Sequence, residues 1–270
     1  MTKNKNLKKF YDGVYLKGEK KHYSNFTVSY DPLEIEKTIL KEINWKNKRV
    51  VDVGCGTGLF AFMAAKKGAK VLGIDYSESA IHFAKKKYSH KNLEFKNADF
   101  NKEVKDQFDI VVSIGTLEHF DNPLRTLKKF KQFLKPNGKI IVTVPNWSNP
   151  RGHVLMTLYY LFNAPITLAD LHYLTPQNFE IWAKELDLKL NWKTLNHSWA
   201  HGDVMVRDLK RRLPKVLYDV NIKIPNKNIK NLLKWLKIGV LPFEEKSNSN
   251  GDMGYYVFSL KTPKSKIKKT

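Results

Sequence analysis

The segment VVDVGCGTGLF at residues 50–60 constrains the fold of this chain more than any other feature. Its apolar residues predict a buried strand that ends at Asp52, and three glycines follow at alternate positions, Gly54, Gly56 and Gly58. Glycine permits sharp turns and lets the backbone approach a ligand to distances at which a Cβ atom would collide. The segment therefore predicts a strand, a tight turn and a helix start that together bind a nucleotide-like ligand.

A dinucleotide-binding fingerprint is the first alternative for this turn. That fingerprint requires glycines in the pattern G-x-G-x-x-G. Counted from Gly54 and Gly56, its third glycine would fall at position 59, which is Leu59. The observed pattern is G-x-G-x-G, so the dinucleotide fingerprint fails.

Strand-like and helix-like segments alternate along most of the chain. Helices of 10–15 residues between apolar strands are typical of a parallel sheet with right-handed crossovers, the doubly wound α/β architecture. The predicted strands are 49–52, 70–75, 92–100, 108–115, 139–146, 188–197 and 254–261. The predicted helices are 33–43, 59–69, 77–88, 121–134 and 175–186.

The same patterns predict the domain organisation. Residues 1–48 are expected to form an N-terminal helical cap, and 49–262 a single α/β domain. The alternation lapses in 147–174 and in 197–252, which we interpret as two irregular, lid-like insertions, because loops of this length in a compact domain are usually functional or disordered. The last residues, 263–270, form a short basic tail.

Composition limits the partners less sharply than the motifs do. The chain has 48 Lys and Arg against 26 Asp and Glu, a formal charge of +22, which favours anionic partners such as nucleic acid or acidic lipid. The basic residues are spread along the whole chain, so compositional bias explains the charge equally well. The single cysteine, Cys55, cannot form an internal disulfide, and no apolar run reaches the length of a membrane span. We expect a cytoplasmic protein.

Further segments extend the glycine motif in a recognisable order. Asp75 ends the strand VLGID, NADF follows at 97–100, FDIVVSIGTLEHFDNP at 108–123 and FLKPNGKIIVTVPN at 133–146. Together with the glycine turn, these segments resemble the class I S-adenosylmethionine (SAM)-dependent methyltransferases. The motif GTLEHF is similar to the corresponding motif of the ubiquinone-biosynthesis-type and related small-molecule O-methyltransferases. The resemblance implies a Rossmann-like seven-stranded sheet, mostly parallel with an antiparallel last strand.

The resemblance also implies SAM as the cofactor. Asp75 is placed to accept hydrogen bonds from two ribose hydroxyls, although an acid before a helix start is also a structural feature. Asp99 is placed at the adenine amino group, with Phe100 or Ala98 beside the ring. The full set of expected cofactor contacts is Asp52, Gly54, Cys55, Gly56, Gly58, Asp75, Tyr76, Ala98, Asp99, Phe100, Ile114, Gly115 and Tyr11.

Catalytic residues are predicted where the fourth strand ends. Methyl transfer is a direct displacement that depends mainly on positioning, and a hydroxyl acceptor also benefits from a base. His119 is the candidate base, Glu118 its orienting partner and His172 a second candidate; a structural role for each stays open. His153, His197 and His201 are more often packing residues. No ligand cluster for a metal is recognised.

Three functions remain open at this point. The first is transfer to a small-molecule acceptor, most simply on oxygen, in an apolar pocket under the two insertions. The second is methylation of RNA or another polyanion, although no N/D-P-P-Y/F motif or RNA-binding module is present. The third is a non-catalytic SAM-binding protein, or one that contacts a membrane through the basic amphipathic segment near Trp235. The sequence does not constrain the oligomeric state.

Overall fold

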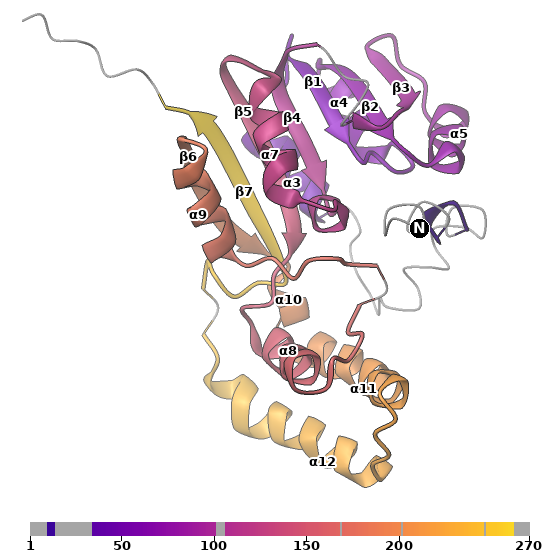
Figure 1. The fold of residues 1–270 in the computed structure, drawn as a ribbon, viewed down its shortest axis with the longest axis vertical. Coiled ribbons are helices and arrows are strands. Elements are labelled where there is room, and N and C mark those ends of the chain that lie inside the picture. The colour runs from indigo at the N-terminus through magenta and orange to yellow at the C-terminus, as the bar shows by residue number, and fades with distance from the viewer. Residues whose placement is uncertain are drawn as a thin grey trace, which may run out of the picture.

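The alternating segments form one mixed, seven-stranded sheet in the order β3-β2-β1-β4-β5-β7-β6. Strands β1 to β5 run parallel to one another, and β7 runs antiparallel to both β5 and β6. The strands are β1 (Arg49–Val53), β2 (Lys70–Asp75), β3 (Leu93–Asn97), β4 (Phe108–Ile114), β5 (Leu134–Pro145), β6 (Leu188–Leu195) and β7 (Met253–Leu260). The predicted doubly wound sheet with an antiparallel last strand is confirmed (Figure 1).

The computed structural model describes residues 10–13, 34–100, 106–167, 169–200, 202–245 and 247–261. Most of the predicted cap, His201 and the basic tail lie outside these residues. The cap is represented by one turn at 10–13 and by helix α3 (Glu34–Glu42). Within the described residues, no helix has the length and apolar character needed to cross a bilayer.

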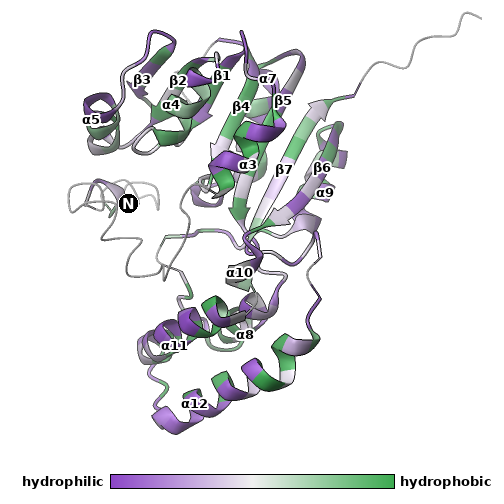
Figure 2. Ribbon diagram, turned by 180° about the vertical axis from the view of Figure 1, so that it is seen from behind, coloured by the Kyte–Doolittle hydropathy of each residue, from purple (hydrophilic) through white to green (hydrophobic). Residues whose placement is uncertain are grey.

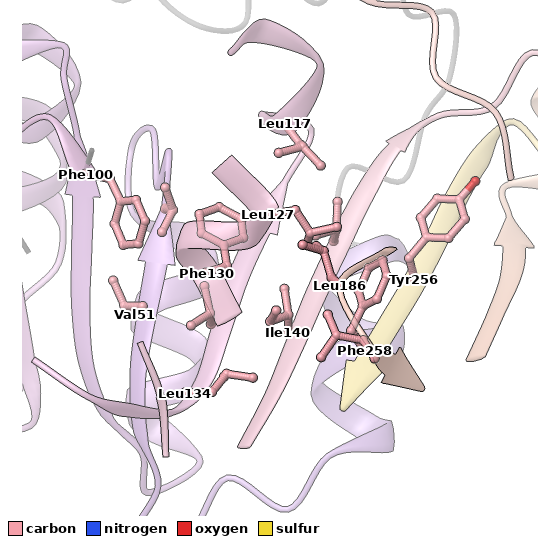
Figure 3. Packing of buried hydrophobic residues seen from close by; sticks show 14 of the residues in the cluster. Val51, Phe100, Leu117, Leu127, Phe130, Leu134, Ile140, Leu186, Tyr256 and Phe258 are labelled. Atoms are coloured by element: carbon pink, nitrogen blue, oxygen red, sulfur yellow. The ribbon is translucent and has the colours of Figure 1, made fainter. Parts of the chain in front are cut away.

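Helices cover both faces of the sheet, and each face has its own hydrophobic cluster. Helices α3, α4 (Leu59–Lys66) and α5 (Glu78–Lys87) pack on one face. Helices α7 (Pro123–Gln132) and α9 (Pro176–Glu185) pack on the other, where Phe130, Tyr256 and Phe258 fill the core shown in Figure 3. Burial of these side chains on both faces explains why the strands read as nearly continuous apolar runs.

Local sequence signals set the helix starts. Ser77 accepts a hydrogen bond from the backbone N–H of Ala80 (3.2 Å) and so caps α5. Asn122 caps α7 in the same way, and Pro123 occupies the first turn, where its missing N–H costs no hydrogen bond. The caps fix where each helix begins relative to the strand end before it.

The two insertions are helical, which corrects the expectation of irregular segments. Their helices gather beyond the carboxyl ends of the parallel strands (Figure 1), and α12 carries both hydrophobic and hydrophilic positions (Figure 2). The physical reason is a third hydrophobic cluster, to which Trp147, Leu155, Leu209 and Leu233 contribute. The helices are α8 (Pro150–Phe162), α10 (His197–Ala200), α11 (Gly202–Asp219) and α12 (Asn226–Trp235), with the turns η2 (Leu236–Val240) and η3 (Leu241–Phe243) after them.

We predict that Phe179→Ala strongly destabilises the fold. The Phe179 side chain is fully buried and stacks on Tyr256 with ring centroids 3.8 Å apart. Truncation should lower the free energy of unfolding by about 3–5 kcal/mol. Ile181→Ala on the same helix, at a side chain that is 51% exposed, should change it by less than about 0.5 kcal/mol. Urea denaturation measures both, and equal effects would contradict this packing.

Candidate functional site

The glycine turn after β1 is held in a left-handed conformation. The φ angles of Gly54, Gly56 and Gly58 are 74°, 51° and 83°. A Cβ atom on Gly54 would lie 2.3 Å from Cγ2 of Thr116, and one on Gly58 would lie 2.4 Å from Cζ of Phe95. The turn therefore requires glycine for both backbone conformation and space, and it brings bare backbone to the edge of the sheet.

Asp75 ends β2 beside this turn, as the sequence predicts. Its Oδ2 accepts a hydrogen bond from the N–H of Gly56 (3.0 Å), and its Oδ1 accepts one from the N–H of Ser77 (2.8 Å). Burial raises the pKa of Asp75 to about 6, while the two backbone hydrogen bonds lower it. Each oxygen has further acceptor capacity. The carboxylate is thus fixed in place with acceptor sites left for two hydroxyls.

Residues that are distant in the sequence also meet beside Asp75. The Ser77 hydroxyl donates to Oδ1 of Asp12 (2.5 Å), which places the turn at 10–13 next to the start of α5. Burial and the nearby charges of Asp75 and Asp12 raise the pKa of Tyr76. Sequence reasoning did not single out Asp12, because nothing local connects it with a strand end about sixty residues away.

Asp52 and Cys55 complete this buried edge. Burial, with the negative charges of Asp75 and Glu36, raises the pKa of Asp52 to about 8. Burial also raises the pKa of the Cys55 thiol, so the sulfur stays protonated at neutral pH. A cationic ligand group bound beside the carboxyls of Asp52 and Asp75 would lower the pKa values of both carboxyls and be stabilised by their negative charge.

The loop after β3 matches the expected adenine site only in part. The Ala98 N–H donates to the carbonyl of Asp75 (3.1 Å), which ties this loop to the end of β2. The Phe100 ring is 3% exposed and meets the rings of Phe130 and Phe133 edge to face, so it packs in the core. The role of Asp99 at an adenine amino group remains a prediction.

The end of β4 adjoins the glycine turn. Gly115 has a φ of 55°, and its N–H donates to the carbonyl of Thr143 (2.9 Å). The Thr116 hydroxyl donates to the carbonyl of Ile114 (3.0 Å) and lies 3.4 Å from that of Gly54. Ile114 and Gly115 therefore lie between the glycine turn and the catalytic candidates, and their contact with the cofactor remains a prediction.

His119 lies in the short turn η1 (Leu117–His119) that follows β4. Its Nδ1 is 3.0 Å from the carbonyl oxygen of Ala169, and its Nε2 is 2.9 Å from the hydroxyl of Tyr11. A carbonyl oxygen only accepts, so Nδ1 carries the hydrogen and Nε2 accepts from the Tyr11 hydroxyl. This geometry defines one tautomer, with the basic nitrogen facing Tyr11.

Burial determines the charge of the His119 imidazole. It lowers the pKa of His119 to about 4, against the opposing effect of the hydrogen bond to Ala169, so the imidazole is neutral at pH 7. Burial, with the charge of Asp170, raises the pKa of Glu118 well above its usual range. Oε2 of Glu118 has no hydrogen-bond partner among the described residues. The structure assigns the support of the imidazole to Ala169, whereas the sequence pointed to Glu118.

A strap of four residues, 169–172, fixes the η1 turn from the opposite side. Three hydrogen bonds join the two segments: His119 Nδ1 to the carbonyl of Ala169 (3.0 Å), Leu171 N–H to the carbonyl of Glu118 (3.1 Å), and His172 Nε2 to the carbonyl of Phe120 (2.9 Å). His172 thus uses its Nε2 to hold the strap. We therefore expect a positioning role for it, while His153 is exposed on α8.

Asp170 of the strap was not found from the sequence. Burial raises its pKa to about 6, and its Oδ1 is 3.8 Å from Nδ1 of His119. Among the described residues, Glu118, His119 and Asp170 offer ligand atoms within 4.8 Å of one another, a spacing compatible with a metal ion. In the structure both imidazole nitrogens are engaged in hydrogen bonds instead.

Comparison with known proteins identifies the family. A family model described as a methyltransferase domain matches residues 44–216, which is more than half of the chain. The chain is a class I SAM-dependent methyltransferase. Over 162 residues the methyltransferase is 34% identical to a ubiquinone biosynthesis O-methyltransferase from Coxiella burnetii, covering 57% of this chain and 69% of that protein. The predicted family and enzyme class are confirmed.

Solved structures show the same fold. The methyltransferase aligns with a putative methyltransferase in complex with the Haloferax volcanii Trm112 activator with a TM-score of 0.60 and 15% identity, covering 93% of this chain and 98% of that one. It also aligns with a magnesium protoporphyrin IX methyltransferase from Synechocystis PCC 6803 that contains bound SAH, with a TM-score of 0.55 and 14% identity, covering 70% and 90% of the two chains.

The residues of the methyltransferase fit its cofactor. The glycine turn leaves no side chain between backbone and ligand, and the Asp75 carboxylate retains acceptor sites for ribose hydroxyls. The buried carboxyl of Asp52 lies in the same edge and suits a ligand that carries positive charge. SAM has both groups, two ribose hydroxyls and a cationic sulfonium.

We predict that Asp75→Asn weakens SAM binding by at least about 100-fold. The substitution removes charge-assisted hydrogen bonds to two hydroxyls, each contributing about 1.5–3 kcal/mol. Calorimetry measures the dissociation constant, and Glu78→Gln, at an exposed acid on α5, is the matched control. Wild-type affinity should also fall as the pH drops below about 6, where Asp75 becomes protonated. Unchanged affinity of Asp75→Asn would contradict the assigned site.

Proposed function

We propose that this methyltransferase transfers the methyl group of SAM to a hydroxyl oxygen of a small aromatic acceptor. The observation that carries the proposal is the contact between the Tyr11 hydroxyl and Nε2 of His119 (2.9 Å). A phenol that donates to the free nitrogen of a neutral imidazole is the arrangement that a general base makes with a phenolic substrate. Tyr11 occupies the place that we assign to the acceptor hydroxyl.

His119 would act as the base in this reaction. SAM supplies the electrophilic methyl group when it is bound. As the acceptor oxygen forms its new bond to carbon, its proton becomes strongly acidic, and Nε2 of His119 takes it. Even a weak base suffices at that stage, which is compatible with the lowered pKa of His119. The resulting imidazolium is stabilised by the Ala169 carbonyl and by Asp170.

The remaining residues would position the acceptor and exclude water. The η1 turn is held by the strap, so the imidazole has little freedom to rotate, and positioning of this kind supplies much of the rate in a direct displacement. The helical insertions lie beyond the strand ends (Figure 1), and we propose them as the walls of the acceptor site, with the domain boundaries stated above.

Small-molecule transfer is favoured over RNA methylation by two observations. The relatives from Coxiella burnetii are named ubiquinone biosynthesis O-methyltransferases, and ubiquinone is a small molecule. The described residues of the insertions form a helical cluster of their own, and the carbonyl of Ala169 holds a neutral histidine whose other nitrogen meets the hydroxyl of Tyr11. An RNA substrate would be supported instead by methylation of RNA that weakens steeply with salt.

We predict that His119→Gln lowers kcat by about 10²–10⁴-fold and leaves the SAM dissociation constant unchanged. Release of S-adenosylhomocysteine with a panel of small phenols and catechols measures the rate, and His153→Gln at an exposed position is the matched control. The acid limb of kcat/KM for the acceptor should lie near pH 4, because burial lowers the pKa of His119 to about 4 and the imidazole accepts no proton from the acceptor once it is itself protonated. Wild-type rates in His119→Gln, or methylation of RNA alone, would contradict the proposal.

We predict that Tyr11→Phe lowers the KM for the acceptor. The variant has no hydroxyl on Nε2 of His119, so the acceptor displaces no hydrogen bond when it binds, and the neutral contact it replaces contributes about 0.5–1.5 kcal/mol. This corresponds to a change in KM of about 2- to 10-fold with nearly constant kcat. If kcat instead fell as far as in His119→Gln, Tyr11 would belong to the proton path and would not occupy the acceptor position.

A further inference from the structure

Four charged side chains, two of them buried and two half-buried, form a cluster where the insertions meet the sheet. Arg151 lies in the first turn of α8, Asp208 and Arg212 lie on α11, and Asp252 precedes β7. Arg151 and Asp208 are 5% and 1% exposed. The contacts are Arg151 Nη1 to Asp208 Oδ2 (3.3 Å), Arg151 Nη2 to Asp252 Oδ1 (2.6 Å), Arg212 Nε to Asp208 Oδ2 (3.2 Å) and Arg212 Nη2 to Asp208 Oδ1 (3.3 Å).

Stability alone is a poor reason for this cluster. Removing two arginines and two aspartates from water costs several kcal/mol per ion, and buried ion pairs are often no more stabilising than apolar residues of similar volume. The cluster instead fixes the orientation of two planar guanidinium groups, because carboxylates bind them. Its role therefore depends on which other parts of the chain these guanidinium groups contact.

Arg212 uses its remaining nitrogen on the chain that leads to the strap. With Nε and Nη2 bound to the Asp208 carboxylate, Nη1 donates to the carbonyl of Ile166 (2.8 Å). The Ile166 side chain is itself 1% exposed. A bidentate arginine–carboxylate pair fixes the plane of the guanidinium, so the third donor points in a defined direction.

Ile166 is linked to the strap through its neighbour Thr167. The N–H of Asp170, a strap residue, donates to the hydroxyl of Thr167 (3.3 Å). In the same strap, the carbonyl of Ala169 accepts from Nδ1 of His119 (3.0 Å). The positive charges of Arg212 and Arg151 also act on Asp170, where they lower its pKa against burial. Arg212 therefore anchors the residue next to Thr167, and Thr167 is bonded to the strap that meets the imidazole.

We propose that Arg212 is a positioning residue for His119: it anchors Ile166, and thereby the strap, so that the Ala169 carbonyl holds the imidazole in its Nδ1–H tautomer. This inference rests on the proposed function for its catalytic meaning, because the Nδ1–H tautomer leaves Nε2 free to receive the acceptor proton. Since the anchor lies on α11, it also couples the position of the helical insertion to the state of the base.

The experiment measures the tautomer directly by ¹⁵N NMR of the full chain with labelled histidine. In the wild type, His119 should be predominantly in the Nδ1–H form. In Arg212→Lys the charge beside Asp208 is kept but the fork to Ile166 is lost, and the Nε2–H form should become the major species. Arg211→Lys is the matched control, because Arg211 is the neighbouring residue, is 36% exposed and reaches Asp208 only at 3.9 Å.

A second variant, Asp208→Asn, tests the same link in case Arg212→Lys folds poorly. It retains the shape of the Asp208 side chain but weakens the Arg212–Asp208 ion pair that orients Arg212, and it should also shift His119 toward the Nε2–H tautomer. SAM affinity reports the integrity of the fold. In the phenol assay, kcat should fall by about 10- to 100-fold in both variants while the KM for SAM stays constant.

The results separate the two proposals. If both variants bind SAM normally and keep the wild-type tautomer, Arg212 does not position His119. If both variants lose SAM binding, the cluster is a folding element only, and the proposal is equally overturned. Failure of the phenol assay in the wild type would reject the proposed function, while the tautomer measurement would still decide the role of Arg212.

Discussion

The site depends on one topological constraint, the reversal of strand order at β1. The chain builds β2 and β3 on one side of β1 and then crosses to β4 on the other, so the carboxyl ends of β1, β2 and β4 lie side by side at the switch point. The glycine turn follows β1, Asp75 ends β2 and the η1 turn follows β4. The expected cofactor contacts and His119 are therefore neighbours because of how the sheet is wound.

Burial sets the chemistry at these strand ends. It raises the pKa values of Asp52 and Asp75 and lowers that of His119, so each group is biased toward its neutral form. Under the proposed function, a cationic cofactor would change this balance at the carboxyls of β1 and β2, whereas the imidazole after β4 would remain an uncharged base. The binding of positive charge and the acceptance of a proton are thus assigned to two separate strand ends.

Local patterns made the fold predictable, together with the positions of the glycine turn and Asp75 at neighbouring strand ends. Each strand is a short apolar run with a turn signal at its end, and Asp75 and the glycines are adjacent to such ends in the sequence. The support of His119 was not predictable, because Ala169 lies fifty residues away and contributes only a backbone carbonyl. The cluster around Asp208 joins segments that share no motif. The insertions were expected to be irregular because their apolar positions serve a separate helical cluster, and not the sheet.

A structure of the protein with S-adenosylhomocysteine and a small phenol tests the proposed role of His119 most directly. The phenol hydroxyl should lie within hydrogen-bond distance of Nε2 of His119, with the Tyr11 hydroxyl displaced and the hydrogen bond from Nδ1 to the Ala169 carbonyl kept. A phenol bound away from His119, with Tyr11 still on Nε2, would contradict the assignment of His119 as the base.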